Sequence, residues 1–112
     1  MQLITAIIKP HKLDDVRDAL KARGVNGMTV AEVRGFGRQG GHTETYRGAE
    51  YDISFLPKLA VEVVCDDIDA DALIESIAAA VNTGAIGDGK IWTRPVGRLV
   101  RIRTGEEGVD AV

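Results

Sequence analysis

The residues best suited to chemistry in this sequence are glycines next to cations, and the clearest case is GAIGDGK at residues 84–90. Gly84, Gly89 and Lys90 fit the spacing G-x-x-x-x-G-K of phosphate-binding loops. The next residue is Ile91, where those loops need Ser or Thr for magnesium, and the stretch is expected between a helix and a strand. It is therefore no nucleoside-triphosphatase loop. It is a glycine-rich turn whose lysine either holds phosphate or lies in solvent.

A second glycine-rich stretch, GFGRQG at residues 35–40, matches the dinucleotide-binding pattern G-x-G-x-x-G. That pattern requires a helix to begin at once, so that the helix N-terminus faces pyrophosphate. The residues that follow, GHTETYRG, have no helical spacing of apolar side chains, so this stretch is not a Rossmann element. Its glycines can still bring backbone N–H groups close to an anion, beside Arg38 and Gln39.

Arg101 and Arg103 lie two residues apart in a predicted strand over 98–103, which places both guanidinium groups on one face about 7 Å apart. Such a pair suits a diphosphate or triphosphate, although a solvated basic face has the same pattern. Together with the two glycine-rich stretches, the pair favours a nucleotide phosphate site. No catalytic grouping is visible, because His11 and His42 are isolated and no serine, histidine and aspartate combine.

Composition limits the classes of protein that remain. The 112 residues are expected to form one domain, which at this size buries about two thirds of the surface exposed by the unfolded chain. A net charge of -3 and 4% aromatic residues argue against nucleic acid as a partner. Cys65 is the only cysteine, and at the end of an apolar run we expect it to be buried and unreactive. The N-terminus has no basic leader and no apolar run could cross a bilayer, so we expect a cytoplasmic protein.

Apolar spacing predicts the elements that must position these residues. Two strands are apolar on both faces, and two helices each have an apolar stripe on one side. The expected order is strand 2–9, a helix from Leu13 to a stop at Gly24, strand 27–35, strand 58–66, a second helix that ends before residue 82, short strands 91–94 and 98–103, and a tail of little order.

A β-α-β unit on each side of a long connection predicts an α+β, ferredoxin-like sandwich, with a four-stranded antiparallel sheet and both helices on one face. Two helices cannot cover both faces of strands 2–9 and 58–66, so we expect a homo-oligomer. The connection at residues 36–58 is too rich in glycine and polar side chains for a core, and longer than ordinary connections. We therefore expect it to be a loop with a function.

Five motifs occur together: YRGAEY at residues 46–51, TGAIGDGKIW at residues 83–92, and the junctions KPHKLDDV, GMTV and GFGRQ. They resemble the PII family of nitrogen regulatory signal proteins over nearly the whole chain. Thr93 stands where that family more often has an aliphatic residue. The resemblance implies a homotrimer of single-domain subunits over 1–112, with a long loop at about 37–55, a glycine loop at about 82–90 and a C-terminal tail at about 104–112.

The resemblance implies three clefts between neighbouring subunits that bind ATP or ADP, with the glycine loop on one side and the arginine pair of the neighbour on the other. The implied nucleotide-binding residues are Thr29, Gly37, Arg38, Glu62, Gly87, Gly89, Lys90, Arg101 and Arg103. Gln39 would bind Mg²⁺ through its side-chain oxygen, together with ATP phosphates and 2-oxoglutarate, which suits a hard cation. Gly41 and Lys58 would complete the 2-oxoglutarate site, with Lys58 against the distal carboxylate.

The resemblance also implies what the long loop does. Tyr51 would be nucleotidylated by a separate transferase, with Tyr46 as the other candidate, and Arg47 would enter an ammonium channel from the cytoplasm. The protein would then be no enzyme. It would sense nitrogen and energy status, act on the channel and on regulators of nitrogen metabolism, and meet the membrane only through the channel.

Two other classes of ferredoxin-like protein remain open. An acylphosphatase-type hydrolase would use an arginine-bearing phosphate loop directly before the first helix, where KPHKLDD contains none. A metal-tolerance trimer would have no affinity for nucleotides. Binding of ATP therefore separates a nucleotide sensor from a metal-tolerance trimer.

Overall fold

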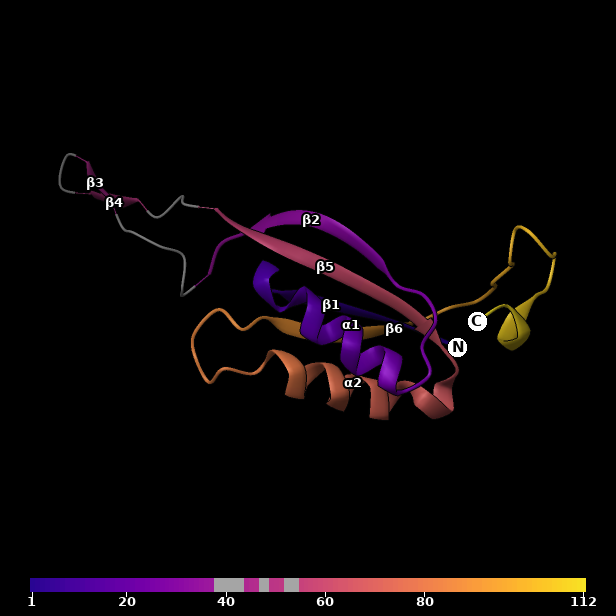
Figure 1. The fold of residues 1–112 in the computed structure, drawn as a ribbon. Coiled ribbons are helices and arrows are strands. Elements are labelled where there is room, and N and C mark those ends of the chain that lie inside the picture. Colours follow the sequence, from indigo (N-terminus) through magenta and orange to yellow (C-terminus); the bar gives the residue numbers. More distant parts are fainter. Residues whose placement is uncertain (38–43, 47–48, 52–54) are drawn as a thin grey trace.

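The computed structural model describes residues 1–37, 44–46, 49–51 and 55–112 (Figure 1). Within these residues the chain forms strands, two α-helices and two short 3-10 helices. In chain order they are β1 (Gln2–Ile8), η1 (Pro10–Lys12), α1 (Leu13–Ala22), β2 (Thr29–Gly35), β3 (Glu44–Tyr46), β4 (Ala49–Tyr51), β5 (Leu56–Cys65), α2 (Asp67–Val81), β6 (Lys90–Pro95) and η2 (Gly108–Ala111).

Four strands form one antiparallel sheet in the order β2-β5-β1-β6, so β1 and β5 are central. The register pairs Ile4 with Val63 and Ala6 with Val61, which puts apolar side chains of both central strands on the same face. Both helices lie on that face (Figure 1). The ferredoxin-like α+β sandwich predicted from the sequence is confirmed.

The core fills the space between this face and the helices. Val16 and Leu20 in α1 are four residues apart and therefore point to the same side of the helix. In α2, Leu73 and Ile77 have the same spacing. Among the residues whose burial the structure describes, the buried apolar side chains are Ile4, Ala6, Ile8, Val16, Leu20, Val61, Val63, Cys65, Ala70, Leu73, Ile77 and Val81. Cys65 is thus buried, as predicted.

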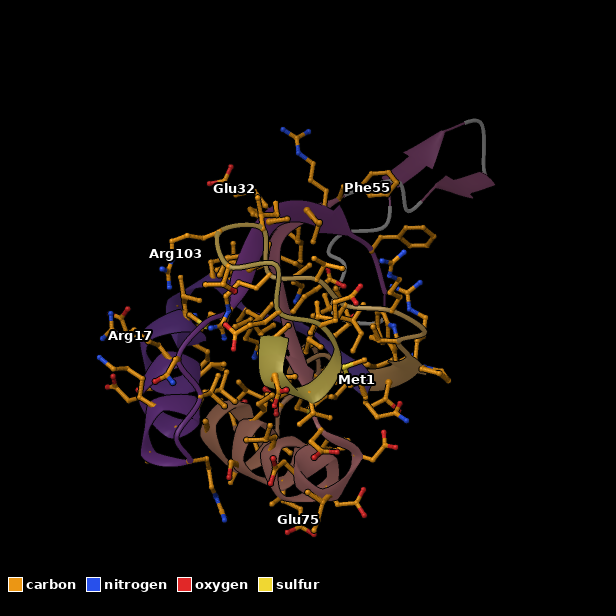
Figure 2. All side chains as sticks on the ribbon, turned by 90° about the vertical axis from the view of Figure 1, so that its right-hand side faces the viewer. Met1, Arg17, Glu32, Phe55, Glu75 and Arg103 are labelled. Carbon is orange, nitrogen blue, oxygen red and sulfur yellow. The ribbon has the colours of Figure 1, made fainter. Side chains whose placement is uncertain are left out.

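The ends and outer surfaces of the helices follow from their sequence. Asp14 and Asp15 lie in the first turn of α1, where carboxylates interact favourably with the helix dipole. Gly24 follows α1 with φ 84°, a left-handed conformation that glycine adopts at little cost. Arg17 on α1 and Glu75 on α2 point away from the sheet into solvent (Figure 2). Among the described residues no helix is both long and apolar enough to span a bilayer.

The other face of the sheet has no helix over it in the described part of the chain (Figure 1). Leu3 and Val64 pair with each other on this face and are only partly covered. The hydroxyl of Thr5 donates a hydrogen bond of 2.9 Å to Glu62 beside them. Trp92, the only tryptophan, pairs with Thr5 from β6 and is exposed. This mixed, partly exposed surface is where we expect subunits to associate.

The prediction of a strand over 98–103 is wrong. Within the described part of the chain, the only bridge that these residues form joins Val100 to Glu107, and the backbone reverses direction between the two. Gly105 has φ 75°, which allows the reversal without strain. Ile102 alternates with arginines as in a strand, but at the tip of the turn its side chain is 98% exposed.

The prediction that residues 104–112 have little order is also wrong. The backbone N–H of Arg101 donates to the carbonyl of Glu106 at 2.8 Å, and the N–H of Gly108 donates to Leu99 at 2.9 Å. η2 follows directly. Residues 98–112 therefore form a folded arm, called the C-terminal arm below, which lies at the end of the sheet near the N-terminus (Figure 1).

The long loop contains an antiparallel hairpin that the sequence did not predict. The register pairs Glu44 with Tyr51 and Tyr46 with Ala49. Each strand has three residues, too few for alternation of apolar side chains to be recognised in the sequence. The hairpin lies beyond the ends of β2 and β5, away from the helices (Figure 1).

We predict that Ile77→Ala lowers the free energy of unfolding by about 2–5 kcal/mol, because Ile77 is fully buried between α2 and the sheet. Ile68→Ala in the same helix is the matched control, since Ile68 is 85% exposed and should change stability by about 0.5 kcal/mol or less. Urea unfolding at one fixed protein concentration measures both. Equal losses for the two variants would contradict this location of the core.

Candidate functional site

Two cavities are lined by the described residues that the sequence singled out for ligand binding, apart from Arg101 and Arg103. The first has a volume of about 650 Å³ and lies where β2 begins. Thr29 and Glu62 line it from the sheet, and Leu99 and Val112 line it from the C-terminal arm. The arm therefore closes this end of the sheet beside two of the predicted nucleotide-binding residues.

The second cavity has a volume of about 760 Å³ and lies at the opposite end of the sheet, where β2 ends. Its lining joins the base of the long loop to the glycine loop. The residues are Ile7, Gly35, Phe36, Gly37, Lys58, Ile86, Gly87, Gly89, Lys90 and Trp92. Backbone from a glycine-rich turn with two lysines is the chemistry that holds phosphate or carboxylate.

The two cavities share no lining residue. Thr29 and Gly35 are the first and last residues of β2, and a strand of this length extends about 20 Å. The predicted nucleotide-binding residues are thus divided between two ends of one subunit. We call the groups the phosphate half-site (Gly37, Gly87, Gly89 and Lys90) and the arm half-site (Thr29, Glu62, Arg101 and Arg103).

Position 89 must be glycine because the glycine loop packs directly against β1. A Cβ atom at Gly89 would lie 1.8 Å from the carbonyl oxygen of Ile7. Gly89 also has φ 106°, and Gly87 has φ 97°, conformations that other residues rarely adopt. The contact with Ile7 fixes where the loop enters β6.

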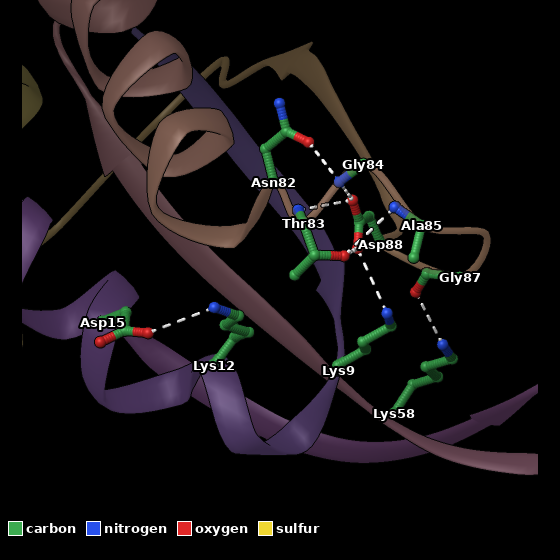
Figure 3. Close-up of polar contacts among 10 residues, drawn as sticks. All are labelled: Lys9, Lys12, Asp15, Lys58, Asn82, Thr83, Gly84, Ala85, Gly87 and Asp88. Atoms are coloured by element: carbon green, nitrogen blue, oxygen red, sulfur yellow. Dashed lines mark hydrogen bonds and ion pairs between the residues drawn. The ribbon is translucent and has the colours of Figure 1, made fainter.

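Lys58 connects the long loop to the glycine loop. It is 7% exposed, and its Nζ donates a hydrogen bond of 3.0 Å to the carbonyl oxygen of Gly87 (Figure 3). Burial, followed by the nearby charge of Lys9, lowers the pKa of Lys58, while Asp88 partly opposes this shift. An ammonium group has three N–H donors, so Lys58 has donors left for a carboxylate. The negative charge of that carboxylate would strengthen the hydrogen bond.

Phe36 and Phe55 bring the two ends of the long loop together. Their ring centroids are 5.3 Å apart with an interplanar angle of 83°, the edge-to-face arrangement that aromatic rings favour. Phe36 also lines the second cavity. The base of the loop therefore borders the same cavity as the phosphate half-site.

The arginine pair differs from the prediction in its surroundings. Arg101 forms an ion pair of 3.1 Å with Glu106 and donates to the carbonyl of Val112 at 3.1 Å. Arg103 lies in the exposed turn of the C-terminal arm. The two guanidinium groups are therefore not equivalent on a strand face: one is held within the arm and the other is exposed.

Glu62 is already oriented by contacts on the uncovered face. In addition to the bond from Thr5, its carboxylate lies 3.9 Å from Arg94. The described residues contain no cluster of three His, Cys, Asp or Glu side chains that could hold a metal ion.

Comparison with known proteins identifies the family to which this chain belongs. The family model described as nitrogen regulatory protein P-II matches residues 1–106. The chain belongs to the P-II family. Over all 112 residues, and over the full length of each relative, it is 60% identical to the nitrogen regulatory protein P-II of Pasteurella multocida, 59% to that of Rhizobium meliloti and 58% to that of Azospirillum brasilense. The resemblance drawn from the motifs is confirmed.

Several residues that the P-II resemblance singles out lie outside the described part of the structure. These are Arg38, Gln39, Gly41 and Arg47, together with His42. The backbone of Tyr51 is described, in β4, but its side chain is not. The roles predicted for these residues stay predictions.

One residue of the P-II glycine loop, Asp88, was not singled out in the sequence. Asp88 accepts hydrogen bonds from Thr83 and forms an ion pair of 3.2 Å with Lys9 (Figure 3). The only signal in the sequence was an acidic residue between two glycines, in a stretch otherwise suited to anions. Hydrogen bonds from Thr83, first from its hydroxyl and then from its backbone N–H, hold the pKa of Asp88 well below the usual range.

We predict that ionisation of Asp88 makes the stability of the folded protein depend on pH at acidic pH. A lowered pKa in the folded state stabilises the protein above the unfolded value of about 3.9, and this stabilisation is lost as the pH falls through the folded pKa. Urea midpoints of the wild type and Asp88→Asn should therefore differ most at pH 5–7 and converge towards pH 2. Asp71→Asn, at an exposed position of α2, is the control. If the difference in urea midpoint between the wild type and Asp88→Asn stayed constant with pH, this contribution of Asp88 would be disproved.

Proposed function

We propose that this protein is a P-II sensor of nitrogen and energy status, which binds ATP or ADP and 2-oxoglutarate and regulates other proteins through its long loop. The observation that carries the proposal is the second cavity, where the glycine loop, Lys58 and the base of the long loop meet. A ligand bound there touches both an anion site and the output element. Neither an acylphosphatase-type nor a metal-tolerance function has a comparable observation in its favour.

We propose that the working unit is a homotrimer. The sheet face opposite the helices carries partly exposed apolar side chains, which supports association. The phosphate and arm half-sites lie at opposite ends of one subunit. In a closed ring, each phosphate half-site would meet the arm half-site of a neighbour, so that three complete sites form.

In each site, the phosphates of ATP or ADP would lie on the glycine loop. Gly87 and Gly89 let the backbone approach closely, and Lys90 supplies a point charge. Gly37 and Arg38 would contact the same nucleotide from the long loop. The neighbour would contribute Thr29, Glu62, Arg101 and Arg103, of which Arg103 is exposed and therefore available to a phosphate.

Mg²⁺ and 2-oxoglutarate would bind at the base of the long loop. Mg²⁺ commonly takes few protein ligands and fills its shell from phosphates and other oxygens. The proposed protein ligand is Gln39, with the remaining oxygens from ATP and the 2-oxo acid group. Lys58 would meet the distal carboxylate and Gly41 would allow close approach of the backbone.

The long loop would carry the output. A ligand that contacts the loop base in only one conformation must favour that conformation, which is a population shift. In the cytoplasm, Arg47 would enter an ammonium channel, and Tyr51 would be nucleotidylated by a separate transferase. Regulators of nitrogen metabolism would read the same loop. In this role the protein catalyses no reaction itself.

Titration calorimetry tests the ligands directly. We expect the wild type to bind ATP, and to bind 2-oxoglutarate only when ATP and Mg²⁺ are both present, because the ligand then completes the metal shell. Absence of ATP binding would end the proposal. Binding of 2-oxoglutarate without ATP would mean that its site is independent of the nucleotide.

Gln39→Ala should abolish detectable 2-oxoglutarate binding and retain ATP binding, since it removes a metal ligand but leaves the glycine loop intact. His42→Ala, in the same loop, is the control and should bind both ligands. Equal affinity for 2-oxoglutarate in Gln39→Ala and wild type would refute the role of Gln39.

Tyr51→Phe should prevent covalent nucleotide attachment, because the phenolic oxygen is the proposed acceptor. Intact mass of protein purified from nitrogen-starved cells measures the adduct. Tyr46→Phe, on the paired strand of the hairpin, is the matched control and should still be modified. An adduct that persists on Tyr51→Phe and disappears from Tyr46→Phe would move the site to Tyr46.

A further inference from the structure

Asp88 lies between two glycines of the phosphate half-site, yet its carboxylate is fully engaged inside the loop. Its Oδ2 accepts hydrogen bonds from the backbone N–H groups of Thr83 at 2.8 Å and Gly84 at 3.0 Å. Its Oδ1 accepts from the Thr83 hydroxyl and from Lys9 Nζ at 3.2 Å (Figure 3). An ionised carboxylate offers about four lone-pair sites, so these four donors fill them. No acceptor site remains for a ligand or a metal ion.

The Asp88 side chain also points away from the cavity where phosphate is proposed to bind. Gly87, Gly89 and Lys90 line the second cavity, whereas Asp88 does not. Asp88 instead lines a third cavity of about 470 Å³ beside the C-terminal end of α2, which shares Ile7, Gly89 and Lys90 with the second cavity. Figure 3 shows the carboxylate enclosed by Thr83, Gly84 and Lys9, while the Gly87 carbonyl faces Lys58 on the outer side of the loop.

Two consecutive loop residues are held by the end of β1. Gly89 packs against the carbonyl of Ile7, and Asp88 forms its ion pair with Lys9, directly after β1 ends. Both side chains of the pair are about one fifth exposed, so the pair is shielded from solvent more than a surface ion pair. The N–H of Gly84 is shared between two acceptors, because it also donates to Asn82 Oδ1 at 2.8 Å.

We infer that Asp88, with Thr83 and Lys9, is a positioning set that holds the glycine loop in the shape that presents Gly87, Gly89 and Lys90 to nucleotide phosphate. The set does not touch the nucleotide. It explains how a carboxylate is tolerated in an anion-binding loop, because Lys9 and two backbone N–H groups balance its charge locally. The inference rests on the proposed nucleotide function of the second cavity.

Titration of Asp88→Asn with ATP, with and without Mg²⁺, tests the inference. We expect the affinity for ATP to fall by roughly 10- to 100-fold, as it does when residues that orient the ligand-binding groups of a site are removed. The factor should be the same with and without Mg²⁺. A loss confined to the Mg²⁺ titration would show that Asp88 is a metal ligand and overturn the inference. Asp71→Asn, exposed on α2, is the control that should bind as the wild type does.

Two variants of Thr83 distinguish a positioning role from general damage to the fold. Thr83→Val keeps the side-chain shape but removes the hydroxyl donor, so affinity should fall, whereas Thr83→Ser restores the donor and should restore affinity. Urea midpoints identify any variant that fails to fold, and amide hydrogen exchange at Thr83 and Gly84 should quicken in Asp88→Asn. Unchanged exchange at these amides would overturn the inference without requiring any ligand.

The outcomes distinguish this inference from the function on which it rests. Wild-type protein that fails to bind ATP would refute the nucleotide site itself. Wild-type binding together with full affinity in Asp88→Asn would refute only the positioning role. Loss of affinity in Thr83→Val without rescue by Thr83→Ser would likewise contradict a role for the hydroxyl.

Discussion

Two helices of 10 and 15 residues cover one face of the four-stranded sheet, and no helix among the described residues covers the other face. This constraint follows from the sequence, because β1 and β5 carry apolar side chains on both faces. The Thr5–Glu62 hydrogen bond and the partly exposed Trp92 lie on the uncovered face. For the residues proposed to bind nucleotide at its two ends, we therefore propose two half-sites that neighbouring subunits complete.

The phosphate half-site illustrates how backbone packing limits side-chain choice. Gly89 leaves no space for a Cβ atom against Ile7, and Lys58 donates to the carbonyl of Gly87. Asp88, between the two glycines, is occupied by Thr83 and Lys9. The loop is thus fixed on three sides before any ligand arrives, which lowers the conformational entropy lost on binding.

Much of the fold could be predicted from the sequence, because its signals are local. Alternation and helical spacing located β1, α1, β2, β5 and α2 to within a few residues. The family could be predicted for another reason: TGAIGDGKIW and YRGAEY are long enough to be specific.

The errors arose where local pattern and tertiary packing disagree. Residues 98–103 alternate like a strand, but the reversal at Gly105 and the ion pair of Arg101 with Glu106 make them one side of a turn. Asp88 was overlooked because its partners are Thr83, five residues earlier, and Lys9, which lies far away in the sequence. Contacts between distant segments leave no periodic signal.

Mixing two defective chains tests most directly whether the site lies between subunits. Lys90→Ala damages the phosphate half-site, and Arg103→Ala, at an exposed position, damages the arm half-site. Each variant alone should bind ATP weakly. After refolding together in equal amounts, a site shared by neighbours predicts tight binding at about one quarter of the wild-type number of sites, because one junction in four then joins two intact halves. No recovery of tight binding in the mixture, with subunit exchange verified, would contradict an intersubunit site.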